Sequence, residues 1–251
     1  MKRCLLLTLL LFSFFRSNAN PPFGAPRYGF SYGASGVISL FHVDERHSQK
    51  AIPRPGFGAT ARLHFYPSTS VHIQIGIEVM SQACAFDSYY FAPGYSTFYD
   101  RSFGYTHTLR TVELYIPLLV RVGLTPGEST ARNIFYLLAG YSPKLFLASS
   151  TNIVRDADGK GVWGGPVSLT YENWFIGPQT GNVMIAGMGL DKRLKFNERF
   201  LSFEAIFRYN LSRFTYDLGK TGNDPLLIKN MCISLQIGYR FAGGGRSGGV
   251  N

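Results

Sequence analysis

The chain has 251 residues, of which 45% are hydrophobic, and its formal net charge is +10 at pH 7. Three cysteines are too few for a disulfide framework, and no Lys/Arg run with interleaved aromatic residues points to nucleic acid. After Phe15 no apolar stretch is long enough for a membrane-spanning helix, so a helical membrane protein is also excluded. If the chain is exported, its positive charge favours the phosphates of outer-membrane lipids as partners, and in either case we expect no nucleic-acid partner.

The N-terminal segment has the pattern of a secretory signal peptide. Two basic residues open the chain, a mostly apolar run follows up to Phe15, and small residues at Ser17 and Ala19 suit cleavage after Ala19. We therefore expect three parts: a signal peptide at 1–19, a folded domain at 20–241, and a flexible glycine-rich tail at 242–251. Of the cysteines that remain, Cys84 and Cys232, the sequence leaves open whether they pair.

Eight later segments alternate between apolar and polar residues with the period of a β-strand. Each has about the ten residues of a tilted strand that crosses a bilayer. We expect the apolar phase to face lipid, so that arginine should cost more at Ile75 than at Gln74 on the other phase. Prolines inside two segments, Pro117 and Pro143, predict a bulge or break at each. The segments begin near Phe30, Phe57, Val71, Val112, Phe135, Met184, Leu201 and Met231.

The connections distinguish a membrane barrel from a soluble β-sandwich, which would share the alternation. After a connection of about a dozen residues, they alternate between short and long: short at 66–70, 124–131 and 192–198, and long at 81–107, 148–180 and 212–227. Long external loops and short periplasmic turns are typical of outer-membrane barrels. We therefore predict an all-β fold, an eight-stranded antiparallel transmembrane β-barrel in the outer membrane.

The polar phase carries charged residues of both signs. Eight strands enclose an interior that side chains fill, so we expect carboxylates and cations to pair across it rather than to line a channel. The residues of this expected network are Arg62, Glu78, Glu113, Arg121, Lys144, Asp191, Glu204, Arg208 and Arg240.

Histidines are the only candidates for a catalytic or metal site. His64 and His72 lie on the polar phase of neighbouring segments, where we expect hydrogen-bonded interior residues. A rim-site enzyme stays open as an alternative, because four residues could meet at the loop rim: His42, Asp44, His47 and His107. Without supporting spacing, we expect no enzymatic activity, no metal and no cofactor.

Aromatic residues mark two further places. The second long connection is dense in them, and such density either folds over the barrel mouth or docks a partner. Tyr239 and Phe241 end the last segment as alternate aromatic residues, which resembles the C-terminal signal that the outer-membrane assembly machinery recognises. The candidate partner residues of the loop are Tyr89, Tyr90, Phe91, Tyr95, Phe98, Tyr99 and Phe103.

Four stretches carry a family resemblance: PGFGATARLHFYPSTSVHIQIGIEV from Pro55, VELYIPLLVRV from Val112, ARNIFYLLAGYSPKLFLAS from Ala131, and the final ISLQIGYRF. They resemble the outer-membrane barrel superfamily of Bacteroidota and, within it, the PorT-like proteins of the type IX secretion system. The resemblance implies a non-enzymatic accessory role in protein export, with other secretion-system proteins as partners. The alternative is a structural or adhesive barrel that binds partners through its aromatic loops.

Overall fold

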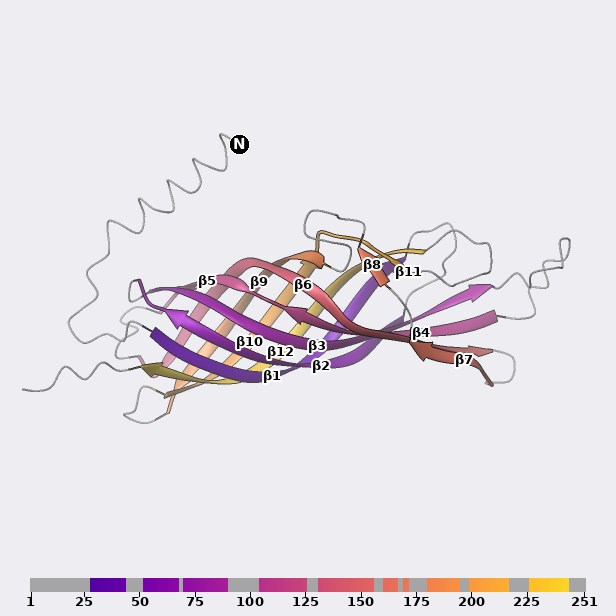
Figure 1. Ribbon diagram of the computed structural model, residues 1–251. Helices are drawn as coiled ribbons and strands as arrows, with labels where there is room; N and C mark the ends of the chain where they lie inside the picture. The colour runs from indigo at the N-terminus through magenta and orange to yellow at the C-terminus, as the bar shows by residue number, and fades with distance from the viewer. Residues whose placement is uncertain are drawn as a thin grey trace, which may run out of the picture.

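The chain forms a closed antiparallel barrel (Figure 1). Eight strand positions follow one another around the ring, one of them shared by β4 and β5, and β12 pairs with β1 to close it. The prediction of an eight-stranded antiparallel barrel is confirmed. The ring consists of β1 (Tyr28–Val43), β2 (Ile52–Phe65), β3 (Val71–Tyr89), β4 (Gly104–Tyr115) with β5 (Leu118–Gly123), β6 (Asn133–Arg155), β9 (Thr180–Arg193), β10 (Arg199–Asn210) and β12 (Leu226–Gly243).

The computed structural model describes most of the chain. Three short strands supplement the ring at its long-loop end: β7 (Gly161–Pro166), β8 (Leu169–Tyr171) and β11 (Phe214–Tyr216). Within the described residues, no helix is long and apolar enough to cross a membrane. The described ranges are 28–43, 52–67, 70–89, 104–125, 131–155, 160–166, 169–171, 180–194, 199–216 and 226–243.

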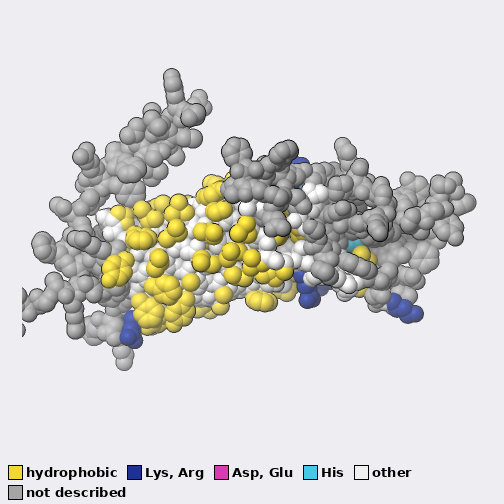
Figure 2. Space-filling view, in the orientation of Figure 1, with side chains coloured by type: hydrophobic (Ala, Val, Ile, Leu, Met, Phe, Trp, Pro, Cys, Tyr) yellow, Lys and Arg dark blue, Asp and Glu magenta, His cyan; other side chains and the backbone are white. Residues whose placement is uncertain are grey.

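The side chains alternate between the interior and the outer surface in the phase that the sequence predicts. On β3, for example, Ile77 is 57% exposed whereas Glu78 beside it is 1% exposed. Figure 2 shows the outward apolar side chains gathered in a band on the face in view, and exposed large apolar residues on the other ring strands continue this apolar belt. Exposing so large an apolar surface to water is unfavourable, whereas contact with lipid chains is not. The barrel therefore spans a membrane.

The two ends of the barrel differ in their connections. Short turns at 66–70, 124–132 and 194–198 lie at one end, and longer connections at 90–103 and 211–225 lie at the other. This arrangement places the short turns in the periplasm and the long connections outside.

The strands at the long-loop end run further than the sequence predicted. Much of the expected connection at 81–107 is strand, since β3 continues to Tyr89 and β4 begins at Gly104. β6 likewise continues to Arg155. For the same reason the connection between β1 and β2, at 44–51, is shorter than expected and no longer than a periplasmic turn.

The two prolines behave differently, although they lie opposite each other. Pro117 interrupts the strand and separates β4 from β5, as predicted, whereas β6 continues through Pro143. The Pro143 carbonyl oxygen accepts a hydrogen bond from the Ile116 N–H at 3.0 Å, so the missing Pro143 donor also faces the β4–β5 junction. The ladder between β6 and β9 therefore passes Pro143 without a register shift. The predicted break at Pro143 was wrong.

Three of the sequence-based predictions fall wholly or largely on residues outside the described ranges. The signal peptide lies there, as do the aromatic loop residues other than Tyr89, which ends β3. Of the expected tail, Ala242 and Gly243 belong to β12 instead, and the rest lies outside the described residues.

Candidate functional site: the barrel interior and its outer end

The interior near the periplasmic turns is organised around Asp191. Its Oδ2 atom lies 2.6 Å from an Arg121 nitrogen and 2.5 Å from an Arg240 nitrogen, and the Ser202 hydroxyl donates a 2.6 Å hydrogen bond to Oδ1. The Asp191 side chain is fully buried. One carboxylate therefore holds two guanidinium groups that come from β5 and β12.

Tyr136 connects this group to the middle of the barrel. The Arg121 guanidinium lies over the Tyr136 ring, 3.5 Å from its centroid, and the Tyr136 hydroxyl donates a 2.8 Å hydrogen bond to Glu204. A Cβ atom on Gly189 would lie 2.3 Å from that ring, so glycine at this position makes room for the tyrosine.

Two further ion pairs cross the middle of the interior. Arg62 on β2 pairs with Glu204 on β10 at 2.8 Å, and Arg208 on β10 pairs with Glu78 on β3 at 2.6 Å. Arg62 also donates to Gln236 at 3.1 Å. These contacts join strands that are not neighbours in the ring and so fill its cross-section.

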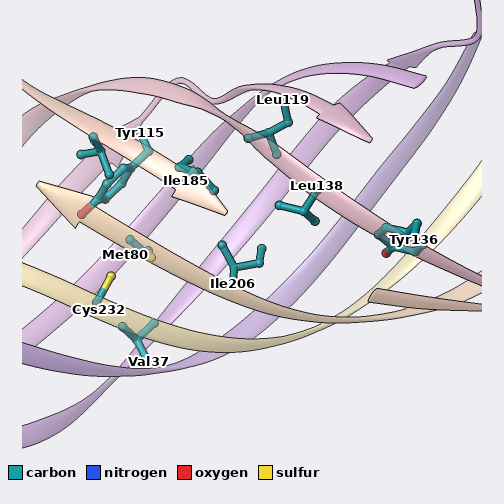
Figure 3. Close-up of a cluster of buried hydrophobic side chains, with 10 residues drawn as sticks. Val37, Met80, Tyr115, Leu119, Tyr136, Leu138, Ile185, Ile206 and Cys232 are labelled. Atoms are coloured by element: carbon teal, nitrogen blue, oxygen red, sulfur yellow. The ribbon is translucent and has the colours of Figure 1, made fainter. Parts of the chain in front are cut away.

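Nearer the outer end the pairing continues with Lys144 and Glu113, whose charged atoms are 2.9 Å apart. The Tyr115 hydroxyl donates to the same carboxylate, and Gln82 donates to the Tyr115 hydroxyl at 2.7 Å. Apolar side chains are interleaved with these polar groups. Figure 3 shows nine by name: Val37, Met80, Tyr115, Leu119, Tyr136, Leu138, Ile185, Ile206 and Cys232.

Above the Lys144–Glu113 pair, three phenylalanines cross the barrel. The Phe214 ring meets Phe41 edge-on at 6.3 Å between centroids and Phe146 edge-on at 5.5 Å. Phe41 belongs to β1 and Phe146 to β6, which lie on opposite sides of the ring. Phe214 on β11 is fully buried between them. The three rings form an aromatic plug at the outer end.

All nine residues of the expected charge network lie in the interior, and each belongs to one of the ion pairs above. Five are cations and four are carboxylates. Because the pairs and the aromatic plug fill the cross-section at successive levels, we expect folded protein to produce no large steady conductance in planar bilayers. A stable high-conductance state in such recordings would contradict a filled interior.

Of the four residues of the alternative enzyme site, the structure describes two, His42 and His107, and it does not bring these two together. His42 is exposed on the outer face of β1, whereas His107 on β4 is fully buried. Asp44 and His47 lie outside the described residues. His64 and His72 are buried near the periplasmic turns, where the Tyr66 ring lies between them, at 6.3 and 4.4 Å from their ring centroids.

No group of three or more His, Cys, Asp or Glu side chains that could hold a metal ion occurs in the described part of the chain. Cys84 and Cys232 are both buried and both free.

Tyr239 and Phe241 lie on the outer wall of β12, with ring centroids 4.7 Å apart, and both contact Tyr32 of β1. They belong to the aromatic surface at the periplasmic end, and an assembly role for them stays a prediction.

Sequence reasoning missed a second region, the outer sheet. Beyond the apolar belt, β3 and β4 stay paired as far as Tyr89 and Gly104, β4 and β6 as far as Tyr105 and Arg155, and β7 adds to β6. Its outward positions include polar residues such as Arg110 and Ser150 beside small ones such as Ala83. The sequence signal for the outer sheet is weak, because in these segments neither the inward nor the outward set of alternate residues is consistently apolar.

No protein family and no curated protein matches the sequence. Solved structures do match the fold. They are outer-membrane β-barrels. The neisserial surface protein NspA is 12% identical, with 88% of this chain and 99% of that chain covered and a TM-score of 0.41. OprG of Pseudomonas aeruginosa is 11% identical, with 88% and 99% covered and a TM-score of 0.47. Ail of Yersinia pestis, solved with the heparin analogue sucrose octasulfate, is 12% identical, with 86% and 99% covered and a TM-score of 0.34.

Proposed function

We propose that the protein is a non-conducting outer-membrane barrel that works through contact with other proteins, by means of its outer sheet, and that it performs no chemistry. The observation that carries this proposal is the extension of β3, β4 and β6 beyond the apolar belt. A barrel that only needed to span the membrane could end its strands at the belt. Strands that remain hydrogen-bonded outside it provide a rigid platform, and rigid elements present a binding surface at a lower entropic cost than loops do.

The filled interior supports the same proposal, because it leaves the outer surface as the part of the protein that binds a partner. Ion pairs such as Arg62–Glu204 and the aromatic plug occupy the space that a transported solute would need. The buried charges are engaged with one another rather than turned towards a shared cavity. A partner is therefore met outside the barrel.

The resemblance to the PorT-like proteins suggests which process the contact serves. On that reading the protein is an accessory component of protein secretion through the type IX system, and its partner is another component of that system. The structural or adhesive alternative uses the same outer sheet but a different partner, so the two readings are separated by phenotype.

A deletion strain tests the secretion role. We expect it to lose cargo proteins from the medium and to keep them in the periplasm, and the wild-type chain should restore export. A variant in which a short Gly/Ser turn replaces residues 156–166 removes β7. This strand pairs with β6 at the edge of the outer sheet and with none of the other described strands of the ring. It should fold, as seen by heat-dependent gel migration, yet fail to restore export.

Normal export in the deletion strain together with altered adhesion or envelope integrity would replace the secretion role by the structural one. Full complementation of either phenotype by the variant without β7 would show that this edge of the outer sheet is not the contact surface.

A further inference from the structure

Two arginines on the outer wall are placed side by side by the strand register. Arg54 on β2 pairs with Ala83 on β3, and Ala83 pairs with Arg110 on β4. Both arginines are exposed. One strand lies between them, so their Cα atoms are about 10 Å apart, and the small Ala83 side chain leaves the space between the two long side chains open.

A β-bulge turns Arg54 towards this wall. On β2 the outward phase consists of odd positions such as Phe57, which is opposite Ser81, and the register shifts by one residue between Arg54 and Phe57. Without the shift Arg54 would share the inward phase. A Cβ atom at Gly56 would lie 2.0 Å from the Ser81 carbonyl oxygen, so only glycine fits the bulge. Bulges commonly re-aim a side chain in this way.

The arginine pair lies where the apolar belt ends. The next outward residues towards the membrane on β2 and β4 are Phe57, which is 72% exposed, and Val112. Figure 2 shows Lys and Arg side chains directly beyond the belt at its long-loop end. This is the level of lipid headgroups.

No carboxylate whose side chain the structure describes lies beside the pair on the outer wall. None of the described ion pairs joins Arg54 or Arg110 to a carboxylate. The described carboxylates of the barrel wall, such as Glu78 and Glu113, are turned inward and buried. Among the described side chains, the two guanidinium groups at headgroup level therefore have no carboxylate partner.

We propose that Arg54 and Arg110 together bind the phosphate group of an outer-leaflet membrane lipid. The planar guanidinium offers two parallel N–H donors to a phosphate, and two such groups from opposite sides surround it. The exposed Phe57 ring below contacts the acyl chains of the same lipid. Arg110 also belongs to the outer sheet, but lipid binding by the purified barrel is measured without any protein partner, so its test is separate from that of the proposed function.

Native mass spectrometry of the purified barrel in detergent micelles tests the site, with phosphatidic acid as the probe. We expect Arg54→Gln and Arg110→Gln each to weaken its binding about fivefold, the loss expected for one arginine at a charged membrane surface. Arg213→Gln removes an exposed arginine elsewhere at the same end and should change nothing. Ala83→Phe keeps both charges but fills the space between them, and it should weaken binding as well.

Diacylglycerol with the same acyl chains, which lacks only the phosphate, should bind more weakly and equally to all variants. Heat-dependent gel migration establishes that each variant is folded. Unchanged binding of phosphatidic acid by the doubly substituted protein would overturn the proposal. Equal binding of diacylglycerol by the wild type would do the same, as would displacement of the lipid by a soluble sulfated polysaccharide, which would assign the arginines to a polyanion in the medium.

Discussion

Asp191→Asn is expected to destabilise the barrel by about 3–5 kcal/mol, because it leaves the buried guanidinium groups of Arg121 and Arg240 without their shared carboxylate. Asparagine has nearly the same volume, so packing is preserved and the loss reports the charge. Unfolding by urea in lipid vesicles, followed by heat-dependent gel migration, measures the free energy of unfolding.

Ser202→Ala is the matched control, since it removes only the hydrogen bond that a neutral hydroxyl donates to the same carboxylate and leaves both ion pairs in place. Its expected cost is smaller, about 1.5–3 kcal/mol. Adding Arg121→Met to Asp191→Asn should recover part of the lost stability, because one unpaired cation is then gone. If Asp191→Asn costs no more than Ser202→Ala, the two arginines do not depend on this carboxylate.

Ile75→Arg is expected to cost about 2–4 kcal/mol, since Ile75 faces lipid in the middle of the apolar outward run of β3, from Val71 to Val79. The same urea titration measures it. Ser70→Arg places the same side chain in the turn that begins this strand, where headgroups and water meet, and should cost about 0–1 kcal/mol. Equal costs at the two positions would mean that the wall does not face hydrocarbon.

The strands and their phase were predictable because lipid imposes a rule on every second residue. Outside the lipid this alternation is no longer required, so the strand extensions there were not predicted. The extensions of β3, β4 and β6 have polar residues on their outward positions, such as Arg110. The backbone hydrogen bonds that continue these strands do not depend on side-chain hydropathy, so the sequence pattern does not reveal them.

The pairing of individual charges could not be predicted, because it depends on how the strands are staggered around the ring. Asp191 on β9 binds Arg240 on β12, although β10 lies between the two strands. The expectation that arginine costs less at Gln74 than at Ile75 stays a prediction, although the structure adds a cost at Gln74 that the sequence did not show. Gln74 is fully buried and its side-chain oxygen lies 3.4 Å from an Arg62 nitrogen, so an arginine there would meet another cation.

The pairing of β1 with β12 determines when the chain can close into a barrel. Every residue of β1 pairs with a residue of β12, so the first strand of the ring bonds to the last. Until β12 has been made and exported, β1 has an open edge whose backbone donors and acceptors can pair with any other strand. Such long-range pairing is slow, and an unpaired edge cannot be left in hydrocarbon. Nascent chains that stop short of β12 should therefore remain outside the membrane as aggregation-prone intermediates, and insertion waits for the last strand of the chain.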